Sequence, residues 1–358
     1  MKSANLPLIE PATAENIAQA VARLHAGEAI GLPTETVYGL AADAGNASAV
    51  AQIFSAKGRP SDHPLIVHVA TASAAELWAA EWPESARKLA AAFWPGPMTL
   101  IVKRAAHVLD AVTGGQDTVG LRVPSHPVAQ AVLRAFGDAH HGLAAPSANQ
   151  FGQVSPTTAA HVAAEFPDRA LLILDGGACE VGVESTIIDV TGQNGENVRV
   201  LRPGRVRTSD IEQVLGVPIN ESTEGAPRVS GMLASHYAPR TQTLMLATGR
   251  LRMQLRAFRH AQARQPNRCV ITHSFDAEPA ERLRVIRLAD DARTWERELY
   301  ALLRALDVEH YGALLIEAPP DTPEWDAVND RVQRATQRDA ALMAADDSTS
   351  TGHEQSAP

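Results

Sequence analysis

The chain has 358 residues, of which 45% are hydrophobic and 20% charged, and its formal charge at pH 7 is −9. This length allows two ordinary domains with well-buried cores, and the composition excludes a disordered polymer. The negative charge argues against a large phosphate-binding surface, so we expect no stable nucleic-acid binding.

Helical and strand patterns alternate through the first part of the chain, which predicts an α/β domain over residues 1–218. A helix is predicted over residues 13–25 and a strand over residues 29–32. A second helix is predicted between a cap at Asn46 and a stop at Gly58. Further short, β-branched strands are predicted over residues 65–69, 99–102, 119–123, 171–174 and 185–190.

Two later helix starts carry recognisable signals. We expect a helix after Ser155, because its hydroxyl is a suitable cap and Pro156 suits the first helical position. We expect another at Ser209, because Glu212 completes a capping box three residues later.

Residues 219–241 lack a sustained period and carry Gly, Ser and Pro, which is typical of a linker. A second α/β domain is predicted over residues 242–343, and the polar, Ser-rich residues 344–358 are expected to be disordered. In the second domain we expect strands near residues 244–246, 269–272 and 313–316, and helices near residues 294–306 and 322–336.

Two general features bear on location and redox chemistry. The sequence has no long uncharged apolar run and no secretory signal, so we expect a cytoplasmic protein that does not enter the membrane. Its two cysteines, Cys179 and Cys269, lie far apart and form no CxxC pair, so we expect plain core residues.

A phosphate group would have to be held by side chains in this protein, because the sequence has neither a Walker loop nor a GxGxxG motif after a predicted strand. Lys57 and Arg59 place two cations beside a predicted helix end, in a turn with Gly58 and Pro60. On chemistry alone, a solvated basic turn is the simpler interpretation.

A second cluster follows an apolar strand. Ser147 and Asn149 offer a hydroxyl and an amide, and Ser155 lies at a predicted helix start with free N–H groups. Together these donors suit the phosphates and sugar of a nucleotide. A Ser/Asn loop of this kind is, however, more often an ordinary turn.

A third group lies at other strand ends, where sites in α/β proteins tend to form, and comprises Arg122, Ser185, Thr186 and Arg202. His68 lies within a predicted strand, where a core histidine and a substrate contact are about equally expected. The other histidines show no metal-ligand spacing, and no Ser/His/Asp or Cys/His order is evident.

Taken together, these segments resemble the threonylcarbamoyl-AMP synthases, in the long form called Sua5, whose catalytic part is called the YrdC-like domain. The matching motifs occur in the family's order and approximate spacing: PTETVYGLAADA, KGRP with HPLIVH, WPGPMTL, VGLRVP, APSAN with SPTTAAHV, ESTIIDV and LRPGRV. They extend over about residues 14–206, and HYAP in the linker continues the resemblance into the second domain.

The resemblance implies an open, twisted, YrdC-like α/β sheet followed by a smaller, Rossmann-like α/β domain. It implies that L-threonine, bicarbonate and ATP are converted to L-threonylcarbamoyl-AMP and pyrophosphate, with Mg²⁺ arriving with ATP. A downstream threonylcarbamoyl transferase complex would use the product for N6-threonylcarbamoyladenosine at position 37 of tRNAs that read ANN codons.

The family's site residues are carried over by motif. Contacts with threonine and the carbamate are expected from Thr36, His68, Arg122, Ser185 and the backbone of Ala145. Contacts with the nucleotide are expected from Lys57, Arg59, His63, Thr118, Ser147, Asn149, Ser155 and Arg202. The linker residues His236 and Tyr237 are expected to form a lid over the nucleotide. Lys57 and Arg59 are the expected catalytic residues, because fixed cations stabilise charge that gathers on pyrophosphate, and no metal ligands of the protein are expected.

The sequence departs from the family pattern at a few positions. His63 stands where relatives usually place Asn, Phe151 stands where a small hydroxyl residue is common, and Ser230 stands where Pro usually precedes Gly-Met. Residues 233–235 lack the basic side chains common before HY.

Two other functions are alternatives. An RNA-binding or ribosome-assembly module is one, although the acidic balance of the first domain counts against it. A carbamoyl transferase that uses carbamoyl phosphate is the other, but such proteins carry acylphosphatase and zinc-finger segments, and none is seen here.

Overall fold

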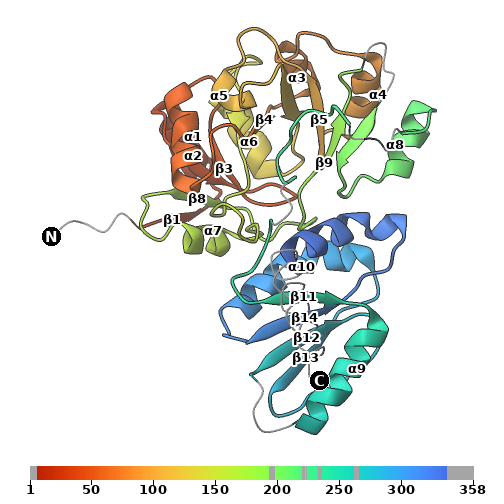
Figure 1. Cartoon of the computed structure of the whole chain (residues 1–358). Helices are drawn as coiled ribbons and strands as arrows, with labels where there is room; N and C mark the ends of the chain where they lie inside the picture. The colour runs from red at the N-terminus through yellow and green to blue at the C-terminus, as the bar shows by residue number, and fades with distance from the viewer. Residues whose placement is uncertain are drawn as a thin grey trace, which may run out of the picture. The chain divides into compact units, whose positions relative to one another are not determined.

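The computed structural model describes residues 6–192, 198–219, 222, 224–232, 236–261 and 266–336. The chain divides into two compact units, one of residues 1–151 and 155–232 and the other of residues 152–154 and 233–358. Figure 1 colours the first from red to green and the second mainly from teal to blue. No helix in the described part of the chain has the length and apolarity needed to cross a membrane.

The described residues of the first unit form one mixed, ten-stranded open sheet, in the order β1-β8-β2-β3-β7-β4-β6-β5-β9-β10. This confirms the predicted open α/β sheet. The strands are β1 (Leu8–Pro11), β2 (Ile30–Leu32), β3 (Gly39–Asp43), β4 (Ile66–His68), β5 (Met98–Lys103), β6 (Thr118–Arg122), β7 (Leu143–Ala144), β8 (Leu172–Asp175), β9 (Thr186–Asp189) and β10 (Arg199–Arg202).

Helices pack on both faces of this sheet (Figure 1). On one face, α1 (Ala14–His25) and α6 (Pro127–Phe136) enclose an apolar cluster with β2, β3 and β8. The larger core lies on the opposite face and extends from β8 to β9. Its helices are α2 (Ala47–Lys57), α3 (Ala72–Leu77), α4 (Glu84–Phe93), α5 (Asp110–Thr113), α7 (Ala159–Glu165) and α8 (Thr208–Leu215).

Local capping signals explain the ends of α1 and α2. The Thr13 hydroxyl accepts the Asn16 N–H and begins α1. The Asn46 side chain accepts N–H groups of the first turn of α2, and Gly58 ends that helix at φ 60°. Because glycine has no Cβ, this left-handed conformation costs it little. Both predicted helices are confirmed.

Two predicted helix starts were wrong. Helix α7 begins at Ala159, capped by Thr158, and not after Ser155. The Pro156 carbonyl instead accepts the N–H of Tyr38, a tertiary hydrogen bond of 2.9 Å that holds this stretch outside the helix. Helix α8 already includes Thr208, and the carboxylate that accepts the N–H of Arg207 is that of Asp210, not that of Glu212.

The second unit has its own sheet, and its described strands are four in number and all parallel, in the order β11-β14-β12-β13. The predicted second α/β domain of Rossmann-like character is confirmed. Its elements are β11 (Thr243–Leu246), α9 (Thr248–Ala261), β12 (Arg268–Thr272), β13 (Leu283–Arg287), α10 (Ala292–Asp307), β14 (Ala313–Glu317), the 3-10 turn η2 (Pro323–Trp325) and a helix over residues 326–336.

Candidate functional site

Three predicted site residues share one face of the sheet. In the parallel pair of β4 and β6, His68 lies opposite Arg122. Side chains alternate along a strand, and Val67 and Leu121 point into the larger core. His68, Thr118 and Arg122 therefore point to the opposite face, and all three are buried.

The loop between β2 and β3 supplies a carboxylate to this face. Arg122 Nη2 donates to Glu35 Oε1 at 2.6 Å, and each side chain is only 5% exposed. The other Glu35 oxygen accepts the N–H of Ser125 at 3.1 Å. The carboxylate thus fixes the direction of the Arg122 guanidinium.

Thr36 follows Glu35 in the same loop and is fully buried. Its hydroxyl lies 2.9 Å from that of Thr34, and its carbonyl accepts the N–H of Gly182 at 3.1 Å. These bonds tie the loop to the segment that leads to Ser185.

His68 is a neutral imidazole. Burial, and then the nearby Arg122 cation, lower its pKa to about 3. Its Nδ1 atom has no hydrogen-bond partner within the described part of the chain, although the residue is only 3% exposed. Buried polar atoms are normally paired, so this nitrogen is available to a ligand.

Lys57 lies in the last turn of α2 and is also buried. Its ammonium nitrogen donates to the carbonyls of Ser147 and Asn149, each at 2.5 Å. Burial, and then the neighbouring Arg59, hold its pKa well below the usual value, while Glu165 and Glu184 act in the opposite direction. Lys57 therefore shapes the segment Ser147–Ser155, which we call the nucleotide loop.

Ser230 joins two of the predicted cations. Both terminal nitrogens of Arg59 lie 3.4 Å from its hydroxyl, and Arg202 Nη1 donates to its carbonyl at 3.0 Å. Arg202 also donates to the carbonyl and the hydroxyl of Ser185, at 2.9 and 3.2 Å. The pairing of β10 with β9 shifts register between Val200 and Arg202, a bulge of the kind that redirects a side chain.

Close backbone packing holds the loop after Arg202 against β9. A Cβ on Gly204 would lie 2.5 Å from the Thr186 nitrogen and 2.8 Å from the Glu184 carbonyl oxygen. The loop after Arg202 can therefore approach β9 only because residue 204 has no side chain.

Further contacts involve the far end of the nucleotide loop and the strand before it. Ser155 donates from its hydroxyl to Glu184 Oε1 at 2.5 Å. The N–H of Ala145 donates to the Ile66 carbonyl, which fixes the backbone through which Ala145 is predicted to contact threonine. Asn149 is buried, and its side-chain amide donates to the Gln150 carbonyl.

Residues 228–230 of the predicted linker pack on the sheet face that carries His68, Thr118 and Arg122. Val229 packs with Ile101, Ile187 and Leu201. Thr118 lines a narrow hollow beneath residues 228–230.

His63 is half-buried, and its ring lies 5.5 Å from that of Phe151 in an edge-on arrangement. Burial, and then Arg59, lower the pKa of His63.

His236 and Tyr237 belong to the second unit, and both are buried. Tyr237 has a positive φ of 60°, uncommon outside glycine. Its ring lies 5.6 Å from that of Tyr300, and the Arg331 guanidinium lies 5.4 Å from its centre. The lid role of His236 and Tyr237 stays a prediction.

Sequence reasoning missed three residues of this network, Glu35, Glu184 and Ser230. Glu35 and Glu184 lie inside motifs that had been recognised, but their partners Arg122 and Ser155 are 87 and 29 residues away, so no local sequence signal identified their roles. The predicted burial of both cysteines is confirmed, and burial raises their thiol pKa values.

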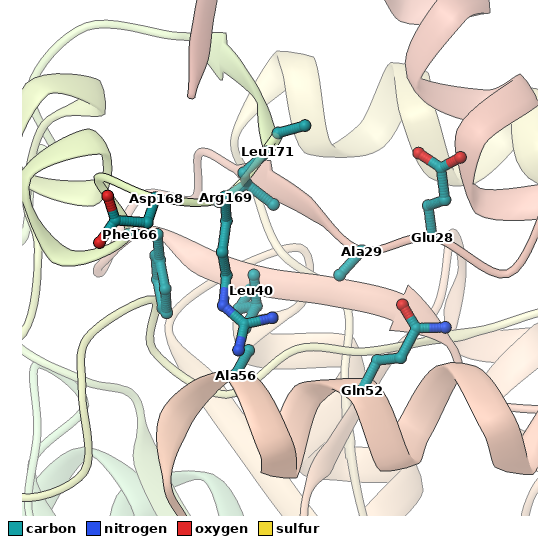
Figure 2. Close-up of a pocket in the computed structure, with 10 residues that line it drawn as sticks. Glu28, Ala29, Leu40, Gln52, Ala56, Phe166, Asp168, Arg169 and Leu171 are labelled. Atoms are coloured by element: carbon teal, nitrogen blue, oxygen red, sulfur yellow. The ribbon is translucent and has the colours of Figure 1, made fainter. Parts of the chain in front are cut away.

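A separate hollow of about 630 Å³ lies elsewhere in the first unit (Figure 2). Phe166 and Leu171 help form its apolar part, and the Arg169 side chain extends over it from the rim. None of the predicted site residues lines it.

The fold and the connected polar face define an α/β enzyme whose site is assembled from strand ends and loops. Residues 22–204 match a family model for Sua5, YciO and YrdC proteins, described as "Telomere recombination". Residues 206–337 match a model described as "Threonylcarbamoyl-AMP synthase, C-terminal domain". The chain belongs to this family, in its two-domain form.

Relatives with this architecture include the threonylcarbamoyl-AMP synthases of Pyrococcus abyssi and Bacillus subtilis. The chain is 36% identical to the first over 87% of its length and 91% of the relative, and 37% identical to the second over 89% and 92%. A crystal structure of P. abyssi Sua5 complexed with L-threonine superposes with a TM-score of 0.80 at 34% identity, covering 92% of this chain and 97% of that one. A variant of the same protein with a histidine and a tyrosine replaced by alanine is equally similar.

Proposed function

We propose that this protein is an L-threonylcarbamoyladenylate synthase that uses L-threonine, bicarbonate and ATP and releases pyrophosphate. The observation that carries the proposal is the continuity of the polar network. Arg59 and Arg202 meet at Ser230, and Arg202 continues to Ser185. The residues assigned to ATP and those assigned to threonine are therefore parts of one connected site.

On the threonine side, Arg122 is oriented by Glu35 and binds the substrate carboxylate, since a guanidinium matches carboxylate geometry. Neutral His68 offers an imidazole nitrogen to a donor of the same substrate. The amino nitrogen attacks the bicarbonate carbon, water leaves, and an N-carboxylated threonine is formed.

On the nucleotide side, a carbamate oxygen attacks the α-phosphorus, and the bond from that phosphorus to the bridging oxygen breaks. The leaving pyrophosphate gains negative charge, which Lys57 and Arg59 stabilise as preorganised cations. Lys57 keeps one further N–H when protonated, beyond the two that it gives to the loop carbonyls.

Magnesium enters as part of the ATP substrate in this proposal. No group of three or more His, Cys, Asp or Glu side chains suited to a metal ion occurs among the described residues. We propose an ion held chiefly by phosphate oxygens, which is how Mg²⁺ is commonly bound with nucleotides. When bound, the ion would neutralise charge on the leaving group.

The proposed product would be consumed by a threonylcarbamoyl transferase complex that modifies tRNA, in the cytoplasm. The synthase itself is proposed to bind small molecules only.

The test is pyrophosphate release, measured with all substrates and with threonine or bicarbonate omitted. Turnover should require both, and Lys57→Ala or Arg59→Ala should reduce it roughly a hundredfold, the scale of a lost transition-state charge contact. Lys103→Ala is the matched control, because Lys103 forms an exposed ion pair with Glu81. Release without threonine, or near-normal turnover in the Lys57 and Arg59 variants, would overturn the proposal.

A further inference from the structure

The middle of the nucleotide loop and its two ends are bound by different residues. Residues 147–151 and Ser155 group with the first unit, whereas residues 152–154 group with the second. The first-unit anchors are Lys57, which binds the carbonyls of Ser147 and Asn149, and Glu184, which binds Ser155. The three residues between these anchors have different partners.

Two backbone carbonyls of this stretch accept hydrogen bonds. The guanidinium of Arg304, in the last turn of α10, donates to the carbonyl of Val154. The N–H of Ala238 donates to the carbonyl of Gly152 at 3.0 Å. Gly152 has a φ of 82°, so the chain turns here through a left-handed conformation that favours glycine.

One face of α10 makes both attachments. Tyr300 and Arg304 are four residues apart, so they lie next to each other on the helix surface. Tyr300 packs on Tyr237, which directly precedes Ala238, and Arg304 binds Val154. The N–H of His236 donates to the Arg334 carbonyl, so this segment is also fixed on the helix over residues 326–336.

We propose that Arg304 is a positioning residue that sets the shape of the nucleotide loop through its contact with Val154. The inference rests on the proposed function, since it takes Asn149 and Ser155 as nucleotide contacts. Arg304 does not touch ATP. It fixes the Val154 carbonyl next to Ser155, and hence the path of the chain between Asn149 and Ser155.

The Arg304 contact should affect the binding of ATP more than the binding of threonine. Thr36, His68 and Arg122 lie on the β2–β3 loop, β4 and β6, and the hydrogen bonds and strand pairing described for them do not involve residues 152–154. Loss of the Arg304 contact should therefore weaken ATP binding and leave threonine binding nearly unchanged. A general loss of structure would weaken both.

The experiment compares the full-length wild type with Arg304→Met, Arg304→Lys and Arg297→Met. Methionine keeps much of the apolar stem without the donor, and lysine restores a charged donor. Arg297 is the matched control, because it lies on the same helix in an exposed pair with Glu298. Affinities for ATP and for threonine are measured separately by calorimetry, and amide hydrogen exchange is followed over residues 150–156.

Arg304→Met should raise the dissociation constant for ATP about tenfold, the scale of a lost hydrogen bond to a charged donor. Arg304→Met should change the dissociation constant for threonine by no more than about twofold and should speed amide exchange over residues 150–156. Arg304→Lys should recover ATP affinity and slow exchange, and Arg297→Met should change neither. Unchanged ATP affinity and exchange in Arg304→Met, or equal losses for both ligands, would overturn the inference. If wild-type protein does not bind ATP, the proposed function fails, and the exchange measurement alone still decides whether Arg304 positions the loop.

Discussion

The buried pair of Glu35 and Arg122 gives the sharpest stability prediction. Glu35→Gln removes the negative charge and leaves the Arg122 guanidinium buried without its counter-ion. The two side chains are 5% exposed, so water screens the change little. Breaking a buried pair by removing one partner costs about 3–5 kcal/mol. We expect about 3 kcal/mol, because the glutamine oxygen retains one of the hydrogen bonds.

The assay is urea unfolding followed by circular dichroism. With a slope of about 1–3 kcal/mol per molar urea, the midpoint of the first unit's transition should fall by about 1 M or more. The matched control is Glu81→Gln, which breaks the exposed pair with Lys103 and should cost less than about 1 kcal/mol. Replacing both partners, as Glu35→Gln with Arg122→Met, should recover part of the loss. If Glu35→Gln unfolds at the same urea concentration as Glu81→Gln, the pair is not an orienting contact.

Further predictions concern protons, packing and pH. ATP should raise the depressed pKa of Lys57, so binding should take up protons when the pH lies between the free and bound pKa values, as seen by calorimetry in buffers of different ionisation heat. Affinity should fall as pH rises through this interval, and equal uptake in Lys57→Met would contradict this. Gly204→Ala should destabilise the first unit by about 1–3 kcal/mol, because the new Cβ meets backbone atoms. Gly249→Ala, with open space around it, should instead stabilise α9 by up to about 1 kcal/mol. If the two variants unfold at the same urea concentration, the packing argument is refuted. Since the pKa of His68 is about 3, threonine affinity between pH 5.5 and 8 should show no titration of this histidine, and an inflection that disappears in His68→Asn would contradict its neutral state.

Features decided by neighbouring residues could be predicted from the sequence. Asn46 and Gly58 act within one turn of the helix ends that they define, so α2 was placed correctly. The start of α7 was misplaced because a tertiary bond from Tyr38 to Pro156 outweighed a good local capping signal. Strand β7 has only two residues, too few for alternation to be detected.

The same limit applies to the site. Motifs identified the cations and hydroxyls one by one, but their connections join distant positions. Arg122 and Glu35 are 87 residues apart, and Arg59 and Ser230 are 171 apart. No local spacing encodes such pairs, so the orienting role of Glu35 and the junction at Ser230 required the folded structure. The contact of Arg304 with Val154, 150 residues away, is a third example.

The central claim is that one polar site joins threonine to the adenylyl group of ATP through a carbamate. Mass spectrometry of the product formed from ATP, L-threonine and bicarbonate labelled with a heavy carbon isotope tests it most directly. The account predicts a threonylcarbamoyl adenylate that carries one labelled carbon and is formed together with pyrophosphate. An adenylate without the label, or no threonine-dependent adenylate at all, would contradict it.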